Sequence, residues 1–375
     1  MLPTRDPAAP TLADVLPSCV AAIRGERNAL GLRAVDRAVV ILVDGLGAAN
    51  LKARSGHART LAGLMTKPSV ITSGFPTTTA AALSTLMTGE LPGRHGIVGY
   101  SALVPSADRV LNQLSGWSDA MRPTEWQRLP TVFETAAEEG IGSSTIGPAR
   151  YSDSGLTHAI LRGADYVVGE TIEDRFRAAR RLLDEGGRRI AYLYVPELDQ
   201  TAHAKGWESD RWTARLETVD REFAALAAAL RPREGALFTA DHGVLDVPAE
   251  RQLVFGDVPE LMQGVRHVGG EPRCLHLYLE PGESAERLAE AWRSSQGDNA
   301  WIATRAEAVD SGWFGEVDEA VLPRLGDVIV APRRLVAYYR EATSDGRGMI
   351  GQHGSCTPEE LRVPLIGVGA FTDRD

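Results

Sequence analysis

The chain has 375 residues, of which 43% are hydrophobic and 24% charged, and 50 acidic against 40 basic residues give it a formal net charge of −10. This length is enough for one large α/β domain or two ordinary ones, while the acidic balance argues against a protein that coats nucleic acid, which needs clustered Lys and Arg. Three cysteines without CxxC spacing predict neither a disulfide framework nor a cysteine-based zinc site.

The first segment of the chain does not have the pattern of a signal peptide. Asp6, Pro10, Asp14 and Pro17 interrupt every apolar run there. No later run is long enough to cross a bilayer, which takes about 20 apolar residues. We therefore expect a cytoplasmic protein that has no membrane partner.

The first predicted strand is AVVILVD, residues 38–44, whose continuous apolarity indicates burial on both faces of a sheet. It ends at Asp44 and is followed by Gly45-Leu46-Gly47. Such a G-x-G could open a dinucleotide-binding turn. Because Asn50 stands in place of the third glycine, the fingerprint of a dinucleotide-binding oxidoreductase fails.

The next elements are a strand at 69–74 and a helix that begins beside three threonines. Pro76 favours an extended turn, and the run 80–87 favours a helix that ends at Gly89. The threonines of 77–79 thus lie at a helix N-terminus, where free N–H groups and the helix dipole attract phosphate. From this pattern alone, any of the three either caps the helix or serves as a nucleophile beside a metal.

Helix and strand alternate further along the chain. A capping box at Thr171 opens a predicted helix over 171–186, and the strand 189–195 follows it and leads to Asp199. His203 lies four residues after Asp199, so one helical turn places both side chains on the same face.

A second amphipathic helix runs from Trp212 to about Leu230, because apolar residues recur there at spacings of three and four. The strand 235–241 follows. It ends at Asp241, and His242 comes directly after it.

The remaining chain holds an irregular stretch and a last strand. Residues 246–350 are rich in proline and glycine and include short β-like pieces at 274–280 and 327–332, so we expect an inserted subdomain. His353 comes after this stretch and precedes the strand 362–369.

This alternation predicts one α/β domain over 1–375, with a doubly wound, mainly parallel sheet and the smaller inserted subdomain. In such sheets, ligands gather at the carboxyl ends of strands. Carboxylates and imidazoles together suit Zn²⁺, with Mn²⁺ or Fe as alternatives. The six metal-competent residues divide into two sets of three, which predicts a catalytic centre with two divalent ions and open positions for substrate. These residues are Asp44, Asp199, His203, Asp241, His242 and His353.

The segment FPTTTAAALSTLMTGELPGRHGIVGY, residues 75–100, resembles the nucleophile segment of the nucleotide pyrophosphatase/phosphodiesterase family, within the alkaline phosphatase superfamily. VDGLG, LDQTAH, TADHG and a late HG occur in the family's order, so the resemblance spans roughly 39–368. It implies an alkaline-phosphatase-like fold.

The resemblance also implies roles for individual residues. Thr79 would be the nucleophile and would contact the first zinc ion. That ion would be bound by Asp44, Asp241 and His242, and the second by Asp199, His203 and His353.

Three aromatic residues are the candidates for substrate binding. Phe75 and Tyr151 could stack on a nucleotide base, although packing in the protein core is the simpler interpretation of both. Tyr100 stands where many members of the family have an asparagine that contacts the phosphate, and Ala80-Ala81-Ala82 replaces their phenylalanine-proline-asparagine. Nucleotide specificity is therefore left open.

The resulting hypothesis is hydrolysis of a small-molecule phosphate ester, either a phosphodiester or a nucleotide pyrophosphate, through a phosphothreonine intermediate. A phosphomonoesterase or phosphonate hydrolase on the same scaffold is the alternative, and an inactive, metal-stabilised binding protein is a more remote one. The sulfatase branch of the superfamily is disfavoured, because no C/S-x-P-x-R element stands near Thr79. The sequence does not predict the oligomeric state.

Overall fold

The computed structural model describes residues 2–372, and within them a seven-stranded sheet forms the centre of a mixed α/β architecture. Five neighbouring strands, from β8 to β6, are parallel, whereas β17 runs antiparallel between β8 and β2. The doubly wound, mainly parallel sheet is thus confirmed. In spatial order its strands are β2 (Val70–Thr72), β17 (Arg362–Gly369), β8 (Glu234–Thr239), β1 (Arg37–Val43), β7 (Arg189–Val195), β5 (Gly142–Gly147) and β6 (Asp165–Val168).

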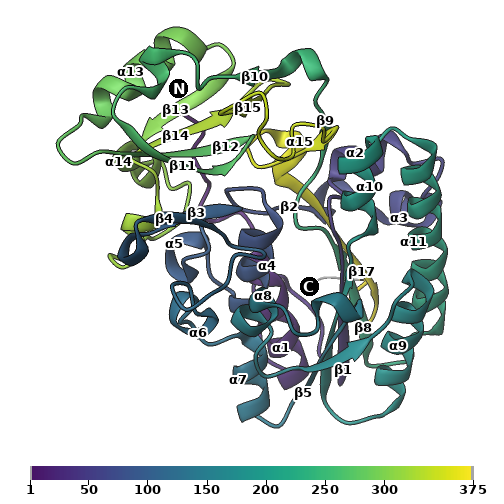
Figure 1. Cartoon of the computed structure of the whole chain (residues 1–375). Coiled ribbons are helices and arrows are strands. Elements are labelled where there is room, and N and C mark those ends of the chain that lie inside the picture. The colour runs from purple at the N-terminus through teal and green to yellow at the C-terminus, as the bar shows by residue number, and fades with distance from the viewer. Residues whose placement is uncertain (1, 373–375) are drawn as a thin grey trace.

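Helices cover both faces of this sheet, which explains the continuous apolar runs of the sequence. Every residue from Ala38 to Val43 in β1 is fully buried, as expected for a central parallel strand. One face carries α1 (Val15–Arg24), α4 (Thr79–Thr88), α7 (Val132–Glu138) and α8 (Gly155–Ile160), and the other carries α9 (Ile172–Asp184) and α11 (Asp210–Ala229) (Figure 1).

The helices begin and end close to the predicted residues. Thr171 forms the expected capping box at the start of α9, which ends at Asp184. α11 begins two residues before Trp212, because the Ser209 side chain accepts a hydrogen bond from the Trp212 N–H and caps the helix there. α4 ends at Gly89, which adopts a left-handed φ of 71°.

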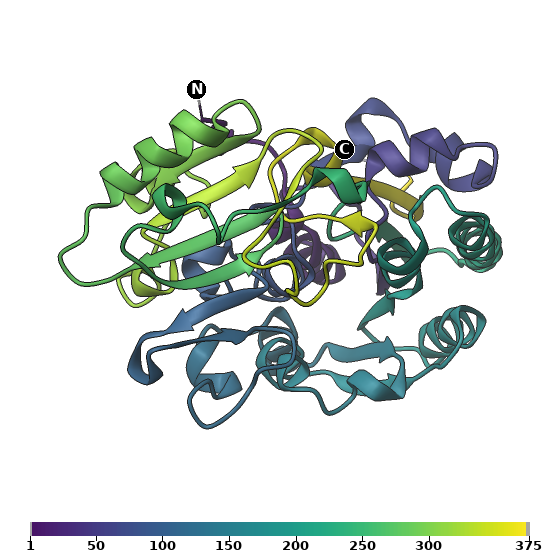
Figure 2. The same cartoon turned by 45° about the horizontal axis from the view of Figure 1, so that its top comes forward.

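A second lobe lies beside the main sheet (Figure 1 and Figure 2). Its core is an antiparallel sheet covered by α13 (Ala285–Gln296) and packed around apolar residues such as Leu277 and Trp292. The predicted β-like pieces at 274–280 and 327–332 are two of its strands. In spatial order the strands are β11 (Val265–Glu271), β12 (Cys274–Leu279), β14 (Val328–Pro332) and β13 (Ala300–Thr304).

A hairpin from outside the 246–350 stretch completes this lobe. It consists of β3 (Ser101–Val104) and β4 (Arg109–Asn112). The Ser101 hydroxyl donates to the Gly270 carbonyl at 2.9 Å, and the Leu103 N–H donates to the Tyr278 hydroxyl at 3.1 Å. The segment that follows α4 therefore connects the two lobes.

Among the described residues, no helix has both the length and the apolar character needed to span a membrane.

Candidate active site

Three neighbouring strands deliver acidic side chains to one edge of the main sheet. Asp44 directly follows β1, and Asp241 lies two residues after the end of β8. Asp199 lies in the first turn of α10 (Glu197–Lys205), the helix that follows β7. Because β8, β1 and β7 are adjacent and parallel, their carboxyl ends meet at the same edge.

The first cluster at this edge consists of Asp44, Asp241 and His242. All three are buried, and their candidate ligand atoms lie within 4.8 Å of one another. His242 Nε2 lies 3.5 Å from Asp44 Oδ1 and 3.5 Å from Asp241 Oδ2. Thr79 opens α4 beside this cluster, with its Oγ1 at 3.3 Å from His242 Nε2.

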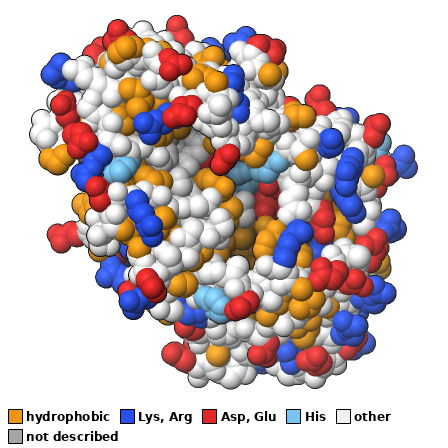
Figure 3. Space-filling view, in the orientation of Figure 1, with side chains coloured by type: hydrophobic (Ala, Val, Ile, Leu, Met, Phe, Trp, Pro, Cys, Tyr) orange, Lys and Arg blue, Asp and Glu red, His pale blue; other side chains and the backbone are white. Residues whose placement is uncertain are grey.

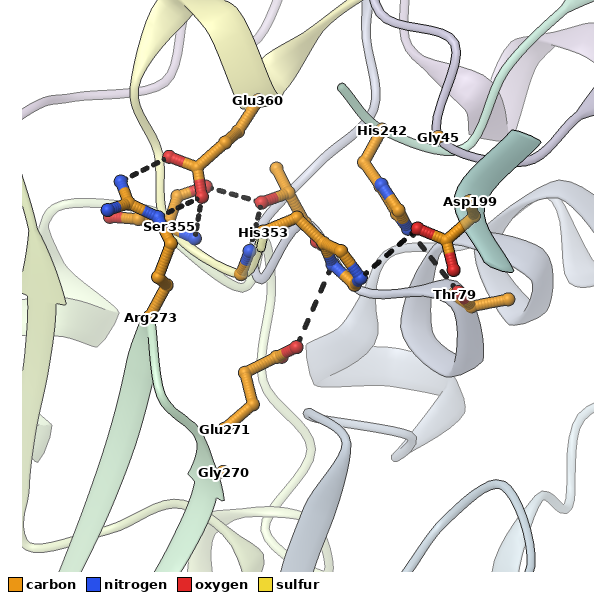
Figure 4. A network of polar contacts seen from close by, with 12 residues as sticks. Gly45, Thr79, Asp199, His242, Gly270, Glu271, Arg273, His353, Ser355 and Glu360 are labelled. Atoms are coloured by element: carbon orange, nitrogen blue, oxygen red, sulfur yellow. Dashed lines mark hydrogen bonds and ion pairs between the residues drawn. The ribbon is translucent and has the colours of Figure 1, made fainter. Parts of the chain in front are cut away.

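The second cluster consists of Asp199, His203 and His353, whose candidate ligand atoms also lie within 4.8 Å of one another. His203 Nε2 lies 3.0 Å from Asp199 Oδ2, and His353 Nε2 lies 3.7 Å from Asp199 Oδ1. The His353 ring stacks on His242 with centroids 3.6 Å apart, so the two clusters adjoin (Figure 4). Their members are those expected from the resemblance.

The buried carboxylates have the hydrogen bonding expected of metal ligands. Asp44 Oδ1, Asp199 Oδ1 and Asp241 Oδ2 have no hydrogen-bond partner among the described residues. The opposite oxygens are satisfied: the Tyr194 hydroxyl donates to Asp44 Oδ2, and the N–H groups of Gly45 and of the histidine after Asp241 each donate to Asp241 Oδ1 at 3.0 Å. A buried anion without a partner is costly. Divalent cations would satisfy these oxygens, so the residues fit such ions.

The three histidines are oriented in the same way. His203 Nδ1 lies 2.7 Å from the Gly351 carbonyl oxygen, and His353 Nδ1 lies 2.8 Å from that of Thr77. His242 Nδ1 lies 3.3 Å from the carbonyl oxygen of the next residue. Because a carbonyl only accepts hydrogen bonds, each Nδ1 carries a proton, and each Nε2 points toward the carboxylates.

Crowding of these groups shifts their proton affinities in opposite directions. Burial and the nearby Asp241 and Asp199 raise the pKa of Asp44 well above its ordinary value. Burial also opposes ionisation of Asp199, but His203 outweighs it, so the pKa of Asp199 is lowered. The same pairing overcomes burial at His203, whose pKa is raised to about 9. Burial and the stacked His242 hold the pKa of His353 well below its ordinary value.

A cavity of about 810 Å³ opens beside Thr79, and both Tyr100 and Tyr151 line it. Figure 3 shows the hollow between the lobes, with histidine, acidic and hydrophobic side chains around it. Phe75 does not line this cavity. Its ring is 4% exposed and packs against Trp313 and Phe314, with centroid distances of 4.8 and 5.4 Å. The Phe75 ring is therefore part of the apolar packing at the second lobe. The expectation that Phe75 binds substrate is corrected accordingly.

Two residues near the site were not found from the sequence. Glu271, at the end of β11, lines the cavity, and its Oε2 lies 3.8 Å from His353 Nδ1 (Figure 4). No local pattern marks it, because it comes from the irregular stretch. Tyr194, which donates to Asp44, does have a signal. It lies on the strand that leads to Asp199 and shares a strand face with Tyr192.

The loop that carries His353 is held from behind by a buried ion pair. Arg273 donates to both Glu360 carboxylate oxygens, at 2.7 Å each, and both side chains are fully buried. Glu360 also accepts a hydrogen bond from the Ser355 N–H at 3.0 Å. Because Arg273 belongs to the second lobe, that lobe helps to position a candidate ligand (Figure 4).

The chain is similar in sequence to known phosphodiesterases. The family model for type I phosphodiesterase / nucleotide pyrophosphatase matches residues 38–356. A curated relative, the venom phosphodiesterase CdcPDE of Crotalus durissus collilineatus, is 24% identical over an alignment of 209 residues that covers 53% of this chain and 25% of the relative. The chain thus matches about a quarter of that protein's length.

Two solved structures share the fold. Murine ectonucleotide pyrophosphatase / phosphodiesterase 5 superposes with a TM-score of 0.63 at 16% identity, covering 88% of both chains. Phosphonoacetate hydrolase from Sinorhizobium meliloti 1021, in complex with phosphonoacetate, gives a TM-score of 0.69 at 18% identity, covering 90% of this chain and 91% of the other.

Proposed function

This chain belongs to the type I phosphodiesterase / nucleotide pyrophosphatase family, and from that premise we propose that it hydrolyses small-molecule phosphodiesters or pyrophosphates with Thr79 as nucleophile. The observation that carries the proposal is the position of Thr79 Oγ1, 3.3 Å from His242 Nε2, beside two buried clusters with unpartnered carboxylate oxygens. A solved relative also supports it, since an inactive form of the murine protein was solved in complex with AMP, a phosphate ester.

The chain's own residues divide the chemistry between them. The first N–H groups of α4 and the helix dipole face the phosphate. The Thr79 hydroxyl gives up its proton as its oxygen bonds to phosphorus and the bond to the leaving group breaks, and the leaving group takes up a proton. Water then attacks phosphorus, cleaves the phosphothreonine bond and restores the Thr79 hydroxyl.

The two clusters would hold the cofactor of this reaction. Asp44, Asp241 and His242 would bind one divalent ion, proposed to be zinc, and the second cluster would bind another. When bound, the ions would supply positive charge that stabilises the reacting oxygens.

The experiment that tests the nucleophile compares two adjacent threonines. We expect Thr79→Ala to lower turnover of bis-p-nitrophenyl phosphate by on the order of 10³-fold or more, with metal content unchanged, whereas Thr79→Ser keeps part of the activity. Thr78→Ala is the matched control, because Thr78 also lines the cavity but no hydrogen bond joins it to His242 in the described part of the chain. Full activity in Thr79→Ala together with loss in Thr78→Ala would place the nucleophile one residue earlier.

The metal and the substrate class are tested by two further measurements. Elemental analysis should find two divalent ions per chain, and chelation should abolish a turnover that added zinc restores. Normal turnover after complete chelation would exclude the metal-dependent scheme. Faster hydrolysis of p-nitrophenyl phosphate than of its diester would favour the monoesterase alternative. The cytoplasmic location expected from the sequence stays a prediction.

A further inference from the structure

The cavity extends well beyond the catalytic threonine, along one face of α4. Thr79, Leu83 and Met87 follow one another at four-residue spacing, so they share a helix face, and all three line the cavity. The other wall comes from α8, whose Leu156 and Ile160 also line the cavity and are buried. We call this part of the cavity the aliphatic recess. It is defined by Leu83, Met87, Leu156 and Ile160.

Two residues of the main sheet that carry hydroxyl groups, Thr145 and Tyr192, also line this cavity. Thr145 of β5 is the register partner of Tyr192 in β7 and of Tyr166 in β6, so the three side chains form a row on one sheet face. All three line the cavity. The Tyr166 hydroxyl donates to the Pro148 carbonyl at 2.9 Å. Thr145 Oγ1 and the Tyr192 hydroxyl are buried and have no hydrogen-bond partner among the described residues.

Buried hydroxyls without a hydrogen-bond partner are rare in protein cores, because an unsatisfied buried polar group is destabilising. Because Thr145 and Tyr192 line the same cavity as the aliphatic recess, their unpaired hydroxyls point to a ligand that brings a neutral hydrogen-bonding group to them. The rest of this ligand should be apolar, because the side chains that line the aliphatic recess are apolar. Polar groups buried against leucine, methionine and isoleucine would lose their hydrogen bonds to water and gain none in return.

The positive charge around the cavity is sparse. Of the described residues that line it, Arg150 is the single Lys or Arg. Arg150 is exposed, lies over the Tyr151 ring at 4.9 Å, and donates to Gln200 at 3.1 Å. The Arg150 guanidinium is thus already in contact with Tyr151 and Gln200 at the edge of the cavity. The aliphatic recess itself has no charge with which to bind a polyphosphate.

We infer that the substrate is a phosphodiester in which one esterified alcohol is a bulky alkyl or aryl group carrying one neutral polar function, seated in the aliphatic recess, and not a nucleoside. This inference rests on the proposed function, and it names the substrate class of the same site. The Thr79 end holds the phosphate, Leu83 and Met87 contact the first carbons of the group, and the Thr145 and Tyr192 hydroxyls bind its polar function.

The test is a series of diesters that share the p-nitrophenyl leaving group. Methyl, butyl and hexyl p-nitrophenyl phosphates are compared with the p-nitrophenyl ester of thymidine 5′-phosphate by kcat/KM. We expect kcat/KM to rise by about threefold per methylene, and the hexyl ester to exceed the thymidine ester at least tenfold. A flat alkyl series, or a preference for the thymidine ester, overturns the inference and leaves the proposed function intact. Failure to hydrolyse any of these diesters contradicts the proposed function itself.

A matched pair of variants localises the effect. Leu83→Gln places an amide in the aliphatic recess and should lower the hexyl-to-methyl ratio of kcat/KM about tenfold. Leu64→Gln is the control, because Leu64 is 38% exposed and lies outside the cavity lining. Thermal unfolding of each variant shows whether it is folded. An unchanged ratio in folded Leu83→Gln contradicts the assignment, and the wild-type series decides the question if that variant does not fold.

The polar function is tested with hexyl-length chains that carry one ester carbonyl at different positions. At least one should give a higher kcat/KM than the plain hexyl chain, and Tyr192→Phe should remove that advantage. If no position improves on the plain chain, the hydroxyl part of the inference is wrong.

Discussion

Tyr194 supports the first cluster from the side of the sheet. Its hydroxyl donates to Asp44 Oδ2, which leaves Asp44 Oδ1 to face His242. We expect Tyr194→Phe to weaken metal binding by about 10- to 100-fold, as when other groups that orient a metal ligand are lost. Competition with a chelator of known affinity measures this change.

The control for Tyr194→Phe is Tyr192→Phe, two residues earlier on the same strand. The Tyr192 hydroxyl has no hydrogen-bond partner among the described residues, so its removal should leave metal affinity unchanged. Equal metal affinity in both variants and the wild type would contradict the role of Tyr194.

The sequence allowed us to predict more of the candidate metal ligands than of the residues that surround them. Asp44 and Asp241 could be found because each ends an apolar run, and the Asp199–His203 spacing marks a shared helix face. His353 was a candidate because it precedes the last strand, and the family resemblance assigned it to the second cluster. Glu271 could not be found, because its place in the cavity depends on how the second lobe packs against the first.

At the scale of elements, the loop after β8 packs backbone against backbone with α15 (Pro358–Leu361). A Cβ added at Gly243 would lie 2.0 Å from the Glu359 carbonyl oxygen, and the Gly243 N–H donates to the Glu360 carbonyl at 2.8 Å. We expect Gly243→Ala to destabilise the fold by about 1–3 kcal/mol, as overpacking does, and to lower metal content because it displaces the preceding histidine. Urea denaturation and elemental analysis measure the two effects.

Gly63→Ala is the matched control for this substitution. Gly63 lies in α3 (Arg59–Leu64), and outside its chain neighbours and the backbone of that helix, no heavy atom of the described residues lies within 4 Å of an added Cβ. Alanine should be neutral or slightly stabilising there, since it favours helix. If Gly243→Ala matched Gly63→Ala in stability and metal content, the close approach of Gly243 to α15 would not contribute to either property.

Elements buried on both faces were predictable, whereas those that depend on distant partners were not. The runs at 38–44 and 189–195 became central strands because continuous apolarity requires cover on two sides. Residues 362–369 form a strand as predicted, but apolarity alone did not indicate that it runs antiparallel. The β3–β4 hairpin was missed, because its short strands are ordered by contacts with the second lobe.

At the scale of the whole molecule, the site depends on both lobes. The main sheet supplies Asp44, Asp199 and Asp241, while the Arg273–Glu360 pair links the second lobe to the loop of His353. Conditions that loosen the second lobe should therefore disturb the candidate active site, although that lobe contributes none of the six candidate metal ligands.

Acid is such a condition, because two fully buried histidines lie where the second lobe is packed. Burial lowers the pKa of His95 and of His276 to about 3 each. His95 Nδ1 accepts the Ile97 N–H at 3.1 Å, and His276 Nδ1 accepts the Gly326 N–H at 3.0 Å. Protonation would place two donors face to face, so both histidines stay neutral in the folded protein.

The sign of the pH dependence follows from these pKa values. Unfolded histidine titrates near 6.5, so between about pH 6.5 and 3 the unfolded state binds more protons than the folded state. The free energy of unfolding contributed by each histidine is fully present above about pH 6.5 and falls by up to about 1.4 kcal/mol per pH unit below it.

A variant isolates the contribution of one of these histidines. Asparagine at position 276 keeps an acceptor for the Gly326 N–H but does not titrate, so between pH 7.5 and 5.5 His276→Asn should lose about 1 kcal/mol less unfolding free energy than the wild type. Urea denaturation at both pH values provides the comparison. His158→Asn is the control, since the His158 side chain is 57% exposed, and it should follow the wild type. If His276→Asn lost as much stability as the wild type over this interval, acid would destabilise the molecule through other groups, and the second lobe would not be its sensitive part.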